Sequence, residues 1–182
     1  MILGYGFTFN NRHSSDFNVV ARSDDRSLLP EQRRNEFAIP GRDGTLDYGN
    51  NAYEKRIITV NIAIVARGLE QLRQSARDVA AWLDGDGLLI FDDEPDKGYR
   101  AKVYSPLSLS LLISCGEATV LFECQPFAQS RHFSQFDCTI STIPHTSAIT
   151  SNGTRPTPCI IMLRNVGSGN LSNIKLIKRA EV

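Results

Sequence analysis

The stretch from Arg56 to Leu83 most constrains the fold, because a two-residue period gives way there to a helical one. Between Arg56 and Val65, β-branched residues dominate and apolar side chains alternate, as in a half-buried strand. Gly68 ends that pattern, and apolar residues then recur at helical spacing. The spacing predicts an amphipathic helix that stops at the glycines after Leu83 and carries on one face Leu69, Leu72, Ala76, Val79, Ala80 and Leu83.

Strand patterns lie on both sides of this helix along the chain. Leu3 to Phe9 alternates apolar and small residues, and Asn10-Asn11 can supply the following turn. The other expected strands are Asp16–Ala21, a hairpin of Gly87–Phe91 with Tyr99–Tyr104, and a second pair, Ser108–Ile113 with Glu117–Gln125. One helix among many strands predicts an α+β, mainly β fold: an antiparallel β-sandwich-like domain with one packed amphipathic helix.

Pro126 marks the predicted domain boundary, since proline cannot continue a central strand. We expect residues 1–126 to form the first domain and residues 127–182 a β-rich C-terminal extension. Fifty-six residues make a marginal core of their own. The extension therefore leans on the first domain or begins a larger second one. Its expected strands are Cys138–Ile143, Cys159–Leu163 and Leu171–Ile177.

Composition narrows the classes of function. Hydrophobic residues make up 41% of the chain, enough to bury a substantial core. Twenty basic residues balance twenty acidic ones, so the electrostatic footprint of a protein that grips nucleic-acid phosphates is missing. The first residues lack a basic start followed by a long apolar run, and no apolar stretch approaches the ~20 residues needed to cross a bilayer. We expect a soluble protein with no membrane partner.

No pattern of catalytic or ligand-binding residues emerges. The cysteines, at positions 115, 124, 138 and 159, form no CxxC pair, and Cys124 and Cys159, in expected strands, are typical of buried free thiols. His13, His132 and His145 lie in polar surroundings without an identifiable nucleophile. Asp92, Asp93, Glu94 and Asp96 could hold a divalent cation, but Pro95 and Gly98 favour a solvated turn. We predict no enzyme, no cofactor and no metal site.

Several turn and strand signals occur in one distinctive order. Phe37-Ala38-Ile39-Pro40-Gly41-Arg42-Asp43-Gly44-Thr45 comes first, followed by the Arg56–Ile64 strand and the helix ending in Ala80-Ala81-Trp82-Leu83. Leu89–Ala101 follows, with its Asp-Asp-Glu-Pro-Asp turn, and then Val120–Ala128, with Cys-Gln-Pro-Phe-Ala. Each signal alone is weak. Their order resembles the distal tail proteins of long-tailed bacteriophages, in the siphovirus tail-component family.

The resemblance covers about the first two thirds of the chain and implies a β-rich, tail-tube-like domain with a packed helix. It implies a virion structural protein, encoded by a phage or prophage, that assembles in the host cytoplasm and resides at the tail tip. In that family six copies form a ring that joins the tail tube to the tip or baseplate hub and lets DNA pass. The implied partners are further copies of the chain, the tail-tube protein and tail-tip or receptor-binding proteins.

The resemblance also guides two hypotheses about surfaces. The loop from Phe37 to Asp47 is a candidate ring interface, with contacts from Phe37, Ile39, Pro40, Gly41, Arg42, Asp43 and Gly44. Residues 84–96 hold six acidic side chains and no Lys or Arg. Asp92, Asp93, Glu94 and Asp96 are therefore candidate channel-facing residues that would repel DNA phosphates; two solvated turns are the simpler alternative.

Two other functions remain open from the sequence. The chain could be a different tail-tube or tail-terminator subunit, which would stack or cap instead of forming a hub. It could also be a small carbohydrate- or peptide-binding β module that uses the C-terminal strands. Members of the family commonly carry a C-terminal β-sandwich, but the residues after Pro126 are too few for a sandwich of ~100 residues, so direct sugar binding is not expected here. The chain is then a short form or part of a longer one.

Overall fold

A computed structural model of the chain describes residues 6–23, 26–49, 52–104, 117–150 and 152–179. It divides into two units, Met1–Ser134 and Gln135–Val182, which are described separately below. The strand expected at Ser108–Ile113, with its turn and Cys115, falls outside the described residues, as do the first residues of the Leu3–Phe9 strand.

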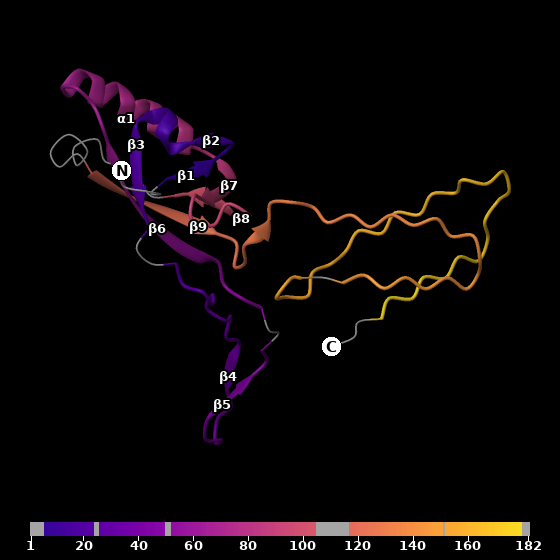
Figure 1. Cartoon of the computed structure of the whole chain (residues 1–182). Helices are drawn as coiled ribbons and strands as arrows, with labels where there is room; N and C mark the ends of the chain where they lie inside the picture. The colour runs from indigo at the N-terminus through magenta and orange to yellow at the C-terminus, as the bar shows by residue number, and fades with distance from the viewer. Residues whose placement is uncertain (1–5, 24–25, 50–51, 105–116, 151, 180–182) are drawn as a thin grey trace. The chain divides into compact units, whose positions relative to one another are not determined.

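The first unit is built on one curled antiparallel sheet of eight strands (Figure 1). The strands follow the order β2-β1-β7-β8-β9-β6-β3, and β10 pairs with β8 off this path. The bounds are β1 Phe7–Phe9, β2 Arg12–His13, β3 Val19–Arg22, β6 Arg56–Ile64, β7 Asp86–Phe91, β8 Lys97–Val103, β9 Glu117–Cys124 and β10 Gln129–Ser130. A separate two-stranded ribbon joins β4, Glu36–Ala38, to β5, Thr45–Asp47.

The longest ladder of the sheet joins β6 to β9, from Arg56 opposite Cys124 to Ala63 opposite Glu117. Along β6 the burial alternates strictly, so that Ile58, Val60 and Ile62 are at most 1% exposed. Such alternation places every second side chain in the core of a sheet with one solvated face. The strand predicted for this segment is confirmed. The matching inward residues of β9 are Val120, Phe122 and Cys124.

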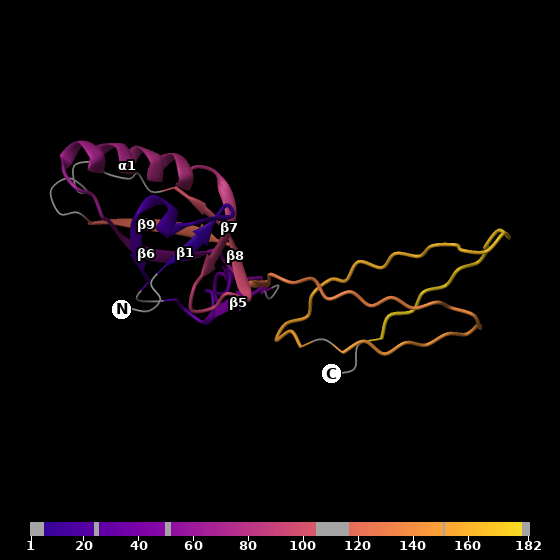
Figure 2. The ribbon, with the colours of Figure 1, turned by 45° about the horizontal axis from the view of Figure 1, so that its top comes forward.

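Among the described residues there is one α-helix, α1, which spans Leu69–Leu83 and lies over one face of the sheet (Figure 2). Trp82 fixes its C-terminal end: the indole ring stacks on Phe17 at 4.5 Å and on Phe7 at 5.1 Å between centroids. Its Nε1–H donates to the carbonyl oxygen of Phe9 at 2.8 Å, so the polar atom of a buried ring is satisfied. The predicted helix is confirmed, and Ala76, Val79 and Leu83 of its predicted apolar face are buried. Leu69, at 58% exposed, and Ala80 lie outside the buried face, so that part of the prediction is wrong. The expected mainly β fold with one packed helix is confirmed.

The chain before β3 departs from the predicted Asp16–Ala21 strand. A short 3-10 helix, η1, occupies Ser14–Phe17, and Asn18 ends it in the left-handed region at φ 54°. The strand therefore begins only at Val19, and it pairs with β6 at the edge of the sheet. The predicted turn at Asn10-Asn11 is confirmed, since both residues have positive φ and join β1 to β2.

The second unit differs from its prediction. Its described residues run as extended chain that folds back on itself in long loops (Figure 1), and they contain no strand. The strands expected at Cys138–Ile143, Cys159–Leu163 and Leu171–Ile177 are therefore wrong as elements of this unit. Their apolar patterns are real, but every described residue of the unit is exposed, so no ladder or core holds them.

Candidate assembly surface

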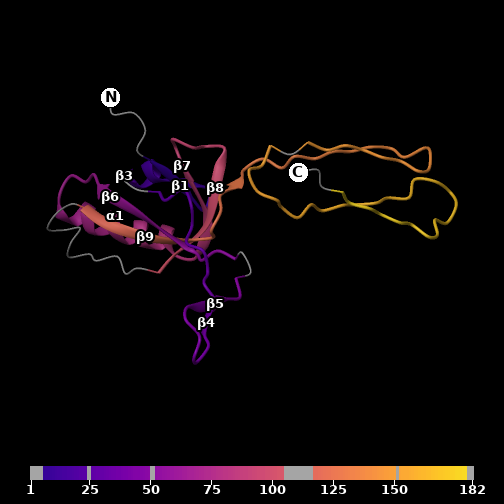
Figure 3. The same ribbon diagram turned by 90° about the horizontal axis from the view of Figure 1, so that it is seen from below.

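The ribbon of β4 and β5 is the outer part of a longer two-stranded arm. Its ladder begins at the amide of Glu54, which donates to the carbonyl of Glu31 at 2.8 Å. It continues through Arg33 with Ala52, at 2.9 Å, and the β4–β5 pairs. The arm thus runs from Glu31 to Glu54, apart from residues 50–51, and extends away from the eight-stranded sheet (Figures 1 and 3).

The arm exposes apolar side chains that have no core to enter. Phe37 is 60% exposed, Tyr48 65% and Ile39 38%, and all three residues of β4 are exposed. An isolated two-stranded ribbon is at best marginally stable in water, because it buries little on either face. Exposed aromatic and aliphatic groups on a projecting ribbon are typical of a surface that a partner covers.

Charged and aromatic contacts hold the base of the arm. The Arg33 guanidinium donates twice to the Glu54 carboxylate, at 2.7 and 3.4 Å, and this bond holds the pKa of the Glu54 carboxyl below its usual value. Tyr53 meets the ring of Phe127 edge-on at 5.0 Å between centroids. These contacts fix where the arm leaves the unit and leave its outer half uncovered.

The structure brings all seven candidate interface residues together at the end of this arm. Phe37 lies in β4, and the other six form the tip that connects β4 to β5. The amide of Arg42 donates to the carbonyl of Ile39 at 3.2 Å, which closes the predicted turn. Gly41 and Gly44 both have φ of +81°, a conformation that strains other residues. The tip is exposed throughout.

Comparison with protein families decides the class of this fold. The model of the phage tail protein RIFT-related domain matches residues 17–124, which include the arm, α1 and the central β6–β9 ladder. The chain belongs to this family. It is therefore a structural component of a phage tail, and the match covers most of the segment on which the resemblance to siphovirus tail proteins rested.

A solved structure shares the fold of this family member. The Dit protein of phage SPP1, described as a paradigm of the hub adsorption apparatus in phages that infect Gram-positive bacteria, superposes with a TM-score of 0.55 at 19% sequence identity. The match covers 69% of this chain and 51% of the SPP1 protein, so the chain spans about half the length of that relative. No curated protein matches the sequence.

The four acidic candidates of this tail protein lie in the turn between β7 and β8, and three of them are paired. Asp92 accepts from His13 at 3.1 Å, Asp93 forms an ion pair with Arg26, and Glu94 accepts from Lys97 at 2.8 Å. Arg26 also lies over the ring of Phe91, 4.4 Å from its centroid. The local charge is therefore smaller than the sequence alone suggests.

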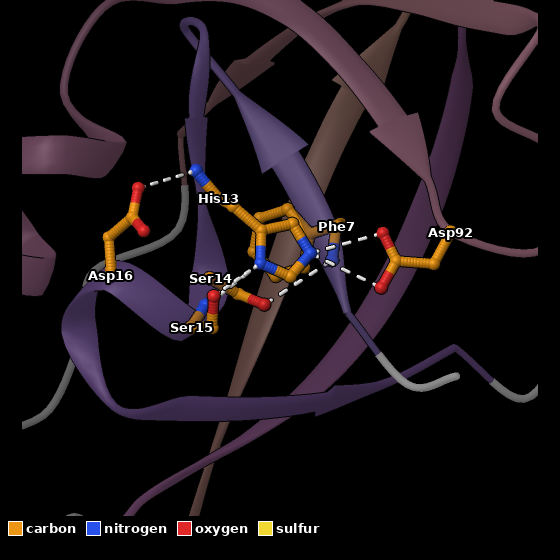
Figure 4. A network of polar contacts seen from close by, with 6 residues as sticks. All are labelled: Phe7, His13, Ser14, Ser15, Asp16 and Asp92. Atoms are coloured by element: carbon orange, nitrogen blue, oxygen red, sulfur yellow. Dashed lines mark hydrogen bonds and ion pairs between the residues drawn. The ribbon is translucent and has the colours of Figure 1, made fainter. Parts of the chain in front are cut away.

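A polar network around His13 joins this turn to the start of the sheet (Figure 4). His13 Nδ1 accepts from the Ser15 amide at 3.2 Å, so the proton sits on Nε2 and is donated to Asp92. The His13 amide donates to Asp16 at 3.1 Å, and the Phe7 amide donates to Ser14 Oγ at 3.4 Å. The network caps η1 and ties β2 to the end of β7, a structural role for a histidine.

The remaining reactive side chains do not gather. Among the described residues, no three His, Cys, Asp or Glu side chains are placed to hold a metal ion. Cys124 is buried, and desolvation raises the pKa of its thiol to about 12, whereas Cys138 and Cys159 are exposed. Within the same residues, no helix has the length and apolar character required to cross a bilayer.

Sequence reasoning missed the length of the arm and what anchors it. The sequence patterns predict no strand between Ala21 and Phe37, although residues 31–36 form one side of the ladder. A usable signal was the opposite charge of Arg33 and Glu54, equidistant from the turn centred near Asp43. A second was the pair of Lys55, directly before β6, and Glu123 of β9, whose Nζ and carboxylate oxygen lie 2.7 Å apart.

Proposed function

We propose that this tail protein assembles into a ring, with six copies, that connects the tail tube to the tip or baseplate at the end of the virion tail. The observation that carries the proposal is the β4–β5 arm, with Phe37 and Tyr48 exposed on a ribbon that buries almost nothing. The RIFT-related family and the fold shared with the SPP1 hub protein support the same assignment. In this proposal, residues 1–126 form the ring and residues 127–182 are an accessory extension.

The arm suits a ring because a closed ring needs two different surfaces that meet head to tail. One copy supplies the projecting arm, through Phe37, Ile39 and the tip residues 40–44. The next copy supplies the surface that covers it. Each subunit then gives one arm and receives one, so the exposed apolar groups become buried in every copy. Assembly would take place in the host cytoplasm, beside the tail-tube and receptor-binding proteins.

A charge reversal at the tip tests this interface. Arg42 is exposed, and its side chain plays no part in the turn, which its backbone amide closes. The variant Arg42→Glu should fold normally and shift the solution mass of the assembly toward the monomer. Arg73→Glu, the same reversal on the exposed face of α1, serves as the matched control. Equal masses for the two variants and the parent ring would remove the arm tip from the interface.

We further propose that the turn holding Asp92, Asp93, Glu94 and Asp96 faces the channel and weakly repels DNA. Two ion pairs, Arg26 with Asp93 and Lys97 with Glu94, reduce the charge of this turn, so the expected effect is weak repulsion without specific binding. The equal numbers of basic and acidic residues in the chain also disfavour a grip on phosphates. An electron cryomicroscopy map of the assembled tail tip that put these carboxylates on the outer rim would overturn this assignment.

A tail-tube or tail-terminator subunit is the rival within the same family. Such a subunit would stack on itself or cap the tube. Negative-stain images of the purified chain distinguish the two: single rings support a hub, and self-stacked tubes support a tube subunit. Co-purification with the tail-tube protein on one face and a tip protein on the other would complete the assignment.

A further inference from the structure

The second unit carries strand-forming sequence that has no strand to pair with. From Phe136 to Ile140, apolar side chains at 136, 138 and 140 alternate with Asp137 and Thr139, as in a half-buried strand. Phe136 is 52% exposed and Ile140 51%. The backbone there is not part of any ladder among the described residues. Residues 136–140 are here called the donor segment.

The first unit offers a free strand edge of similar length. β3 ends the sheet order, and no described strand pairs with its far side. The carbonyl of Asn18 accepts from the amide of Val65, so in this antiparallel pair Val20 and Arg22 direct their backbone groups toward β6. The amides and carbonyls of Val19 and Ala21 therefore point outward. Val19 and Ala21 are each 4% exposed, so little of this edge is open to solvent in the single chain. Backbone groups at the end of a sheet are nevertheless a template for an added strand.

The opposite end of the sheet is a poorer template. β2 has only two residues, Arg12 and His13, and the amide of His13 is already taken by the Asp16 carboxylate at 3.1 Å. β3 has four residues whose burial alternates. The sequence of the donor segment predicts the same half-buried pattern. Its outward side chain Val20 is 52% exposed, so an added strand would also cover apolar surface there.

The path along the sheet from β10 to β3 of the same chain is longer than the linker that joins β10 to the donor segment. Arg22, the end of β3 nearer to β10, pairs with Asn61 of β6, and Asn61 pairs in turn with Thr119 of β9. On β8, Gly98 pairs with Gln129 of β10. Thr119 lies five positions from Cys124, and Ala101, opposite Cys124, lies three from Gly98. The level of Gln129 is therefore eight positions, or about 26 Å, from the level of Arg22 along the strand direction. Reaching the far side of β3 also requires crossing three strand spacings, about 14 Å. Six residues from Ser130 to Phe136 span at most about 22 Å.

Charge favours pairing between copies. Residues 135–182 hold five of the twenty basic residues and two of the twenty acidic residues. Residues 1–134 hold the other fifteen basic and eighteen acidic residues. The second unit thus carries a formal charge of +3 and the first −3. The second unit of one copy is attracted to the first unit of another, whereas two first units repel each other.

We propose that the donor segment of one chain adds to the sheet of a second copy as an antiparallel or parallel neighbour of β3. This inference rests on the proposed self-association, but on no particular number of subunits. Each chain has one donor and one acceptor, so the exchange is head to tail, as a ring requires. It supplies a second contact beside the arm and accounts for apolar residues that the single chain leaves in water.

Hydrogen exchange on the full chain over a concentration series tests the proposal. The amides of Val19 and Ala21 should become protected together with those of the donor segment as concentration rises. The variant Val20→Lys blocks the edge, and the double variant Phe136→Ser with Ile140→Ser removes the apolar face of the donor. Each should lower the concentration-dependent protection about tenfold or more. Leu69→Lys on α1 and Ile143→Ser outside the donor segment, both at exposed positions, are the controls.

Mixing the two variants gives a complementary result. The Val20→Lys chain keeps an intact donor segment, and the double variant keeps an intact β3. In the mixture, donor segments of the Val20→Lys chain should add to β3 of the double variant. Protection at Val19 and Ala21 should therefore return in the double variant and not in the Val20→Lys chain. Protection that does not depend on concentration, or an unprotected β3 at every concentration, would overturn the proposal. Loss of ring mass in Arg42→Glu with donor protection intact would count against the arm interface and leave this contact standing.

Discussion

Two antiparallel pairs in this protein, β6 with β9 and β4 with β5, have the same hydrogen-bonding pattern but opposite relations to water. Along β6, every second side chain is buried, and the facing residues of β9 complete the same core. Along β4, every residue is exposed, including Phe37. The first pair is stabilised by packing within the chain, whereas the second has no such source of free energy.

The difference separates residues that maintain the fold from residues available for assembly. Phe122 in β9 contacts the rings of Phe7 and Phe9, at 5.6 and 5.4 Å between centroids, and is fully buried. Phe37 is the same residue type, but it is 60% exposed. A change in the core pair should therefore reduce stability, and a change in the arm should reduce association while stability is preserved. The predictions below are ordered by their expected effect on the free energy of unfolding.

The largest effect is expected from Phe122→Ala. The substitution leaves a cavity among Phe7, Phe9 and β6, which should lower the free energy of unfolding by about 3–5 kcal/mol. The matched change Phe37→Ala on the arm should cost less than about 0.5 kcal/mol. Urea unfolding followed by the fluorescence of Trp82, the one tryptophan of the chain, measures both. Similar losses for the two variants would break the distinction between core and arm.

A smaller loss is expected from Trp82→Phe. Phenylalanine keeps much of the stack on Phe17 and Phe7 but cannot donate to the buried carbonyl of Phe9. An unsatisfied buried carbonyl should lower the free energy of unfolding by about 1–3 kcal/mol. Circular dichroism during urea unfolding gives the value, since the fluorescent reporter is gone. A variant as stable as the parent would mean that this bond contributes nothing to the docking of α1.

The Arg33–Glu54 pair should make the base of the arm sensitive to acid. The hydrogen bond from Arg33 lowers the pKa of Glu54 below its ordinary value of 4.5. Its stabilisation is therefore complete above that value and is lost as the pH falls through the lowered value. Both groups are exposed, so the effect is small and screened by salt. Amide chemical shifts of the arm between pH 3 and 6 report it, and Glu54→Gln should abolish the pH dependence.

Alkylation of the free thiols should distinguish buried from exposed parts of the chain without a change in sequence. Burial raises the pKa of the Cys124 thiol to about 12, so little thiolate forms near neutral pH and access is blocked. Cys138 and Cys159 are exposed. Alkylation of the native chain at pH 8, read by peptide mass spectrometry, should modify these two well before Cys124. Comparable rates at Cys124 and Cys159 would show that β9 opens readily.

Local patterns were enough to predict the core of the fold. The alternation of Ile58, Val60 and Ile62 identified β6, and the spacing of Ala76 and Val79 identified the buried face of α1. In β6 the residues that define the pattern are those that the fold buries. In α1 the same holds for Ala76, Val79 and Leu83, whereas Leu69 and Ala80 are exposed. Pattern and structure agree because the free energy of burial acts on residues that are close in sequence.

The strand patterns of the C-terminal unit led to wrong predictions, because no partner strand within the described residues buries their apolar side chains. Cys159–Leu163 is an unbroken apolar run, yet its side chains are exposed, because strand patterns form strands only when a partner supplies a ladder. The arm was underestimated because its ladder depends on cross-strand contacts, such as Arg33 with Glu54, that span 21 residues. The seven interface candidates lie together at the outer end of the arm, and their role in a ring is still a prediction.

The solution mass of the full chain, measured by light scattering over a concentration series, tests the central claim most directly. The account predicts a hexamer for the parent chain and for Arg73→Glu, and a shift toward the monomer for Arg42→Glu. Unfolding curves of the three should coincide at concentrations low enough that all are monomeric. A parent chain that is monomeric at every concentration, or an Arg42→Glu variant with the mass of the parent hexamer, would contradict a ring built through the β4–β5 arm.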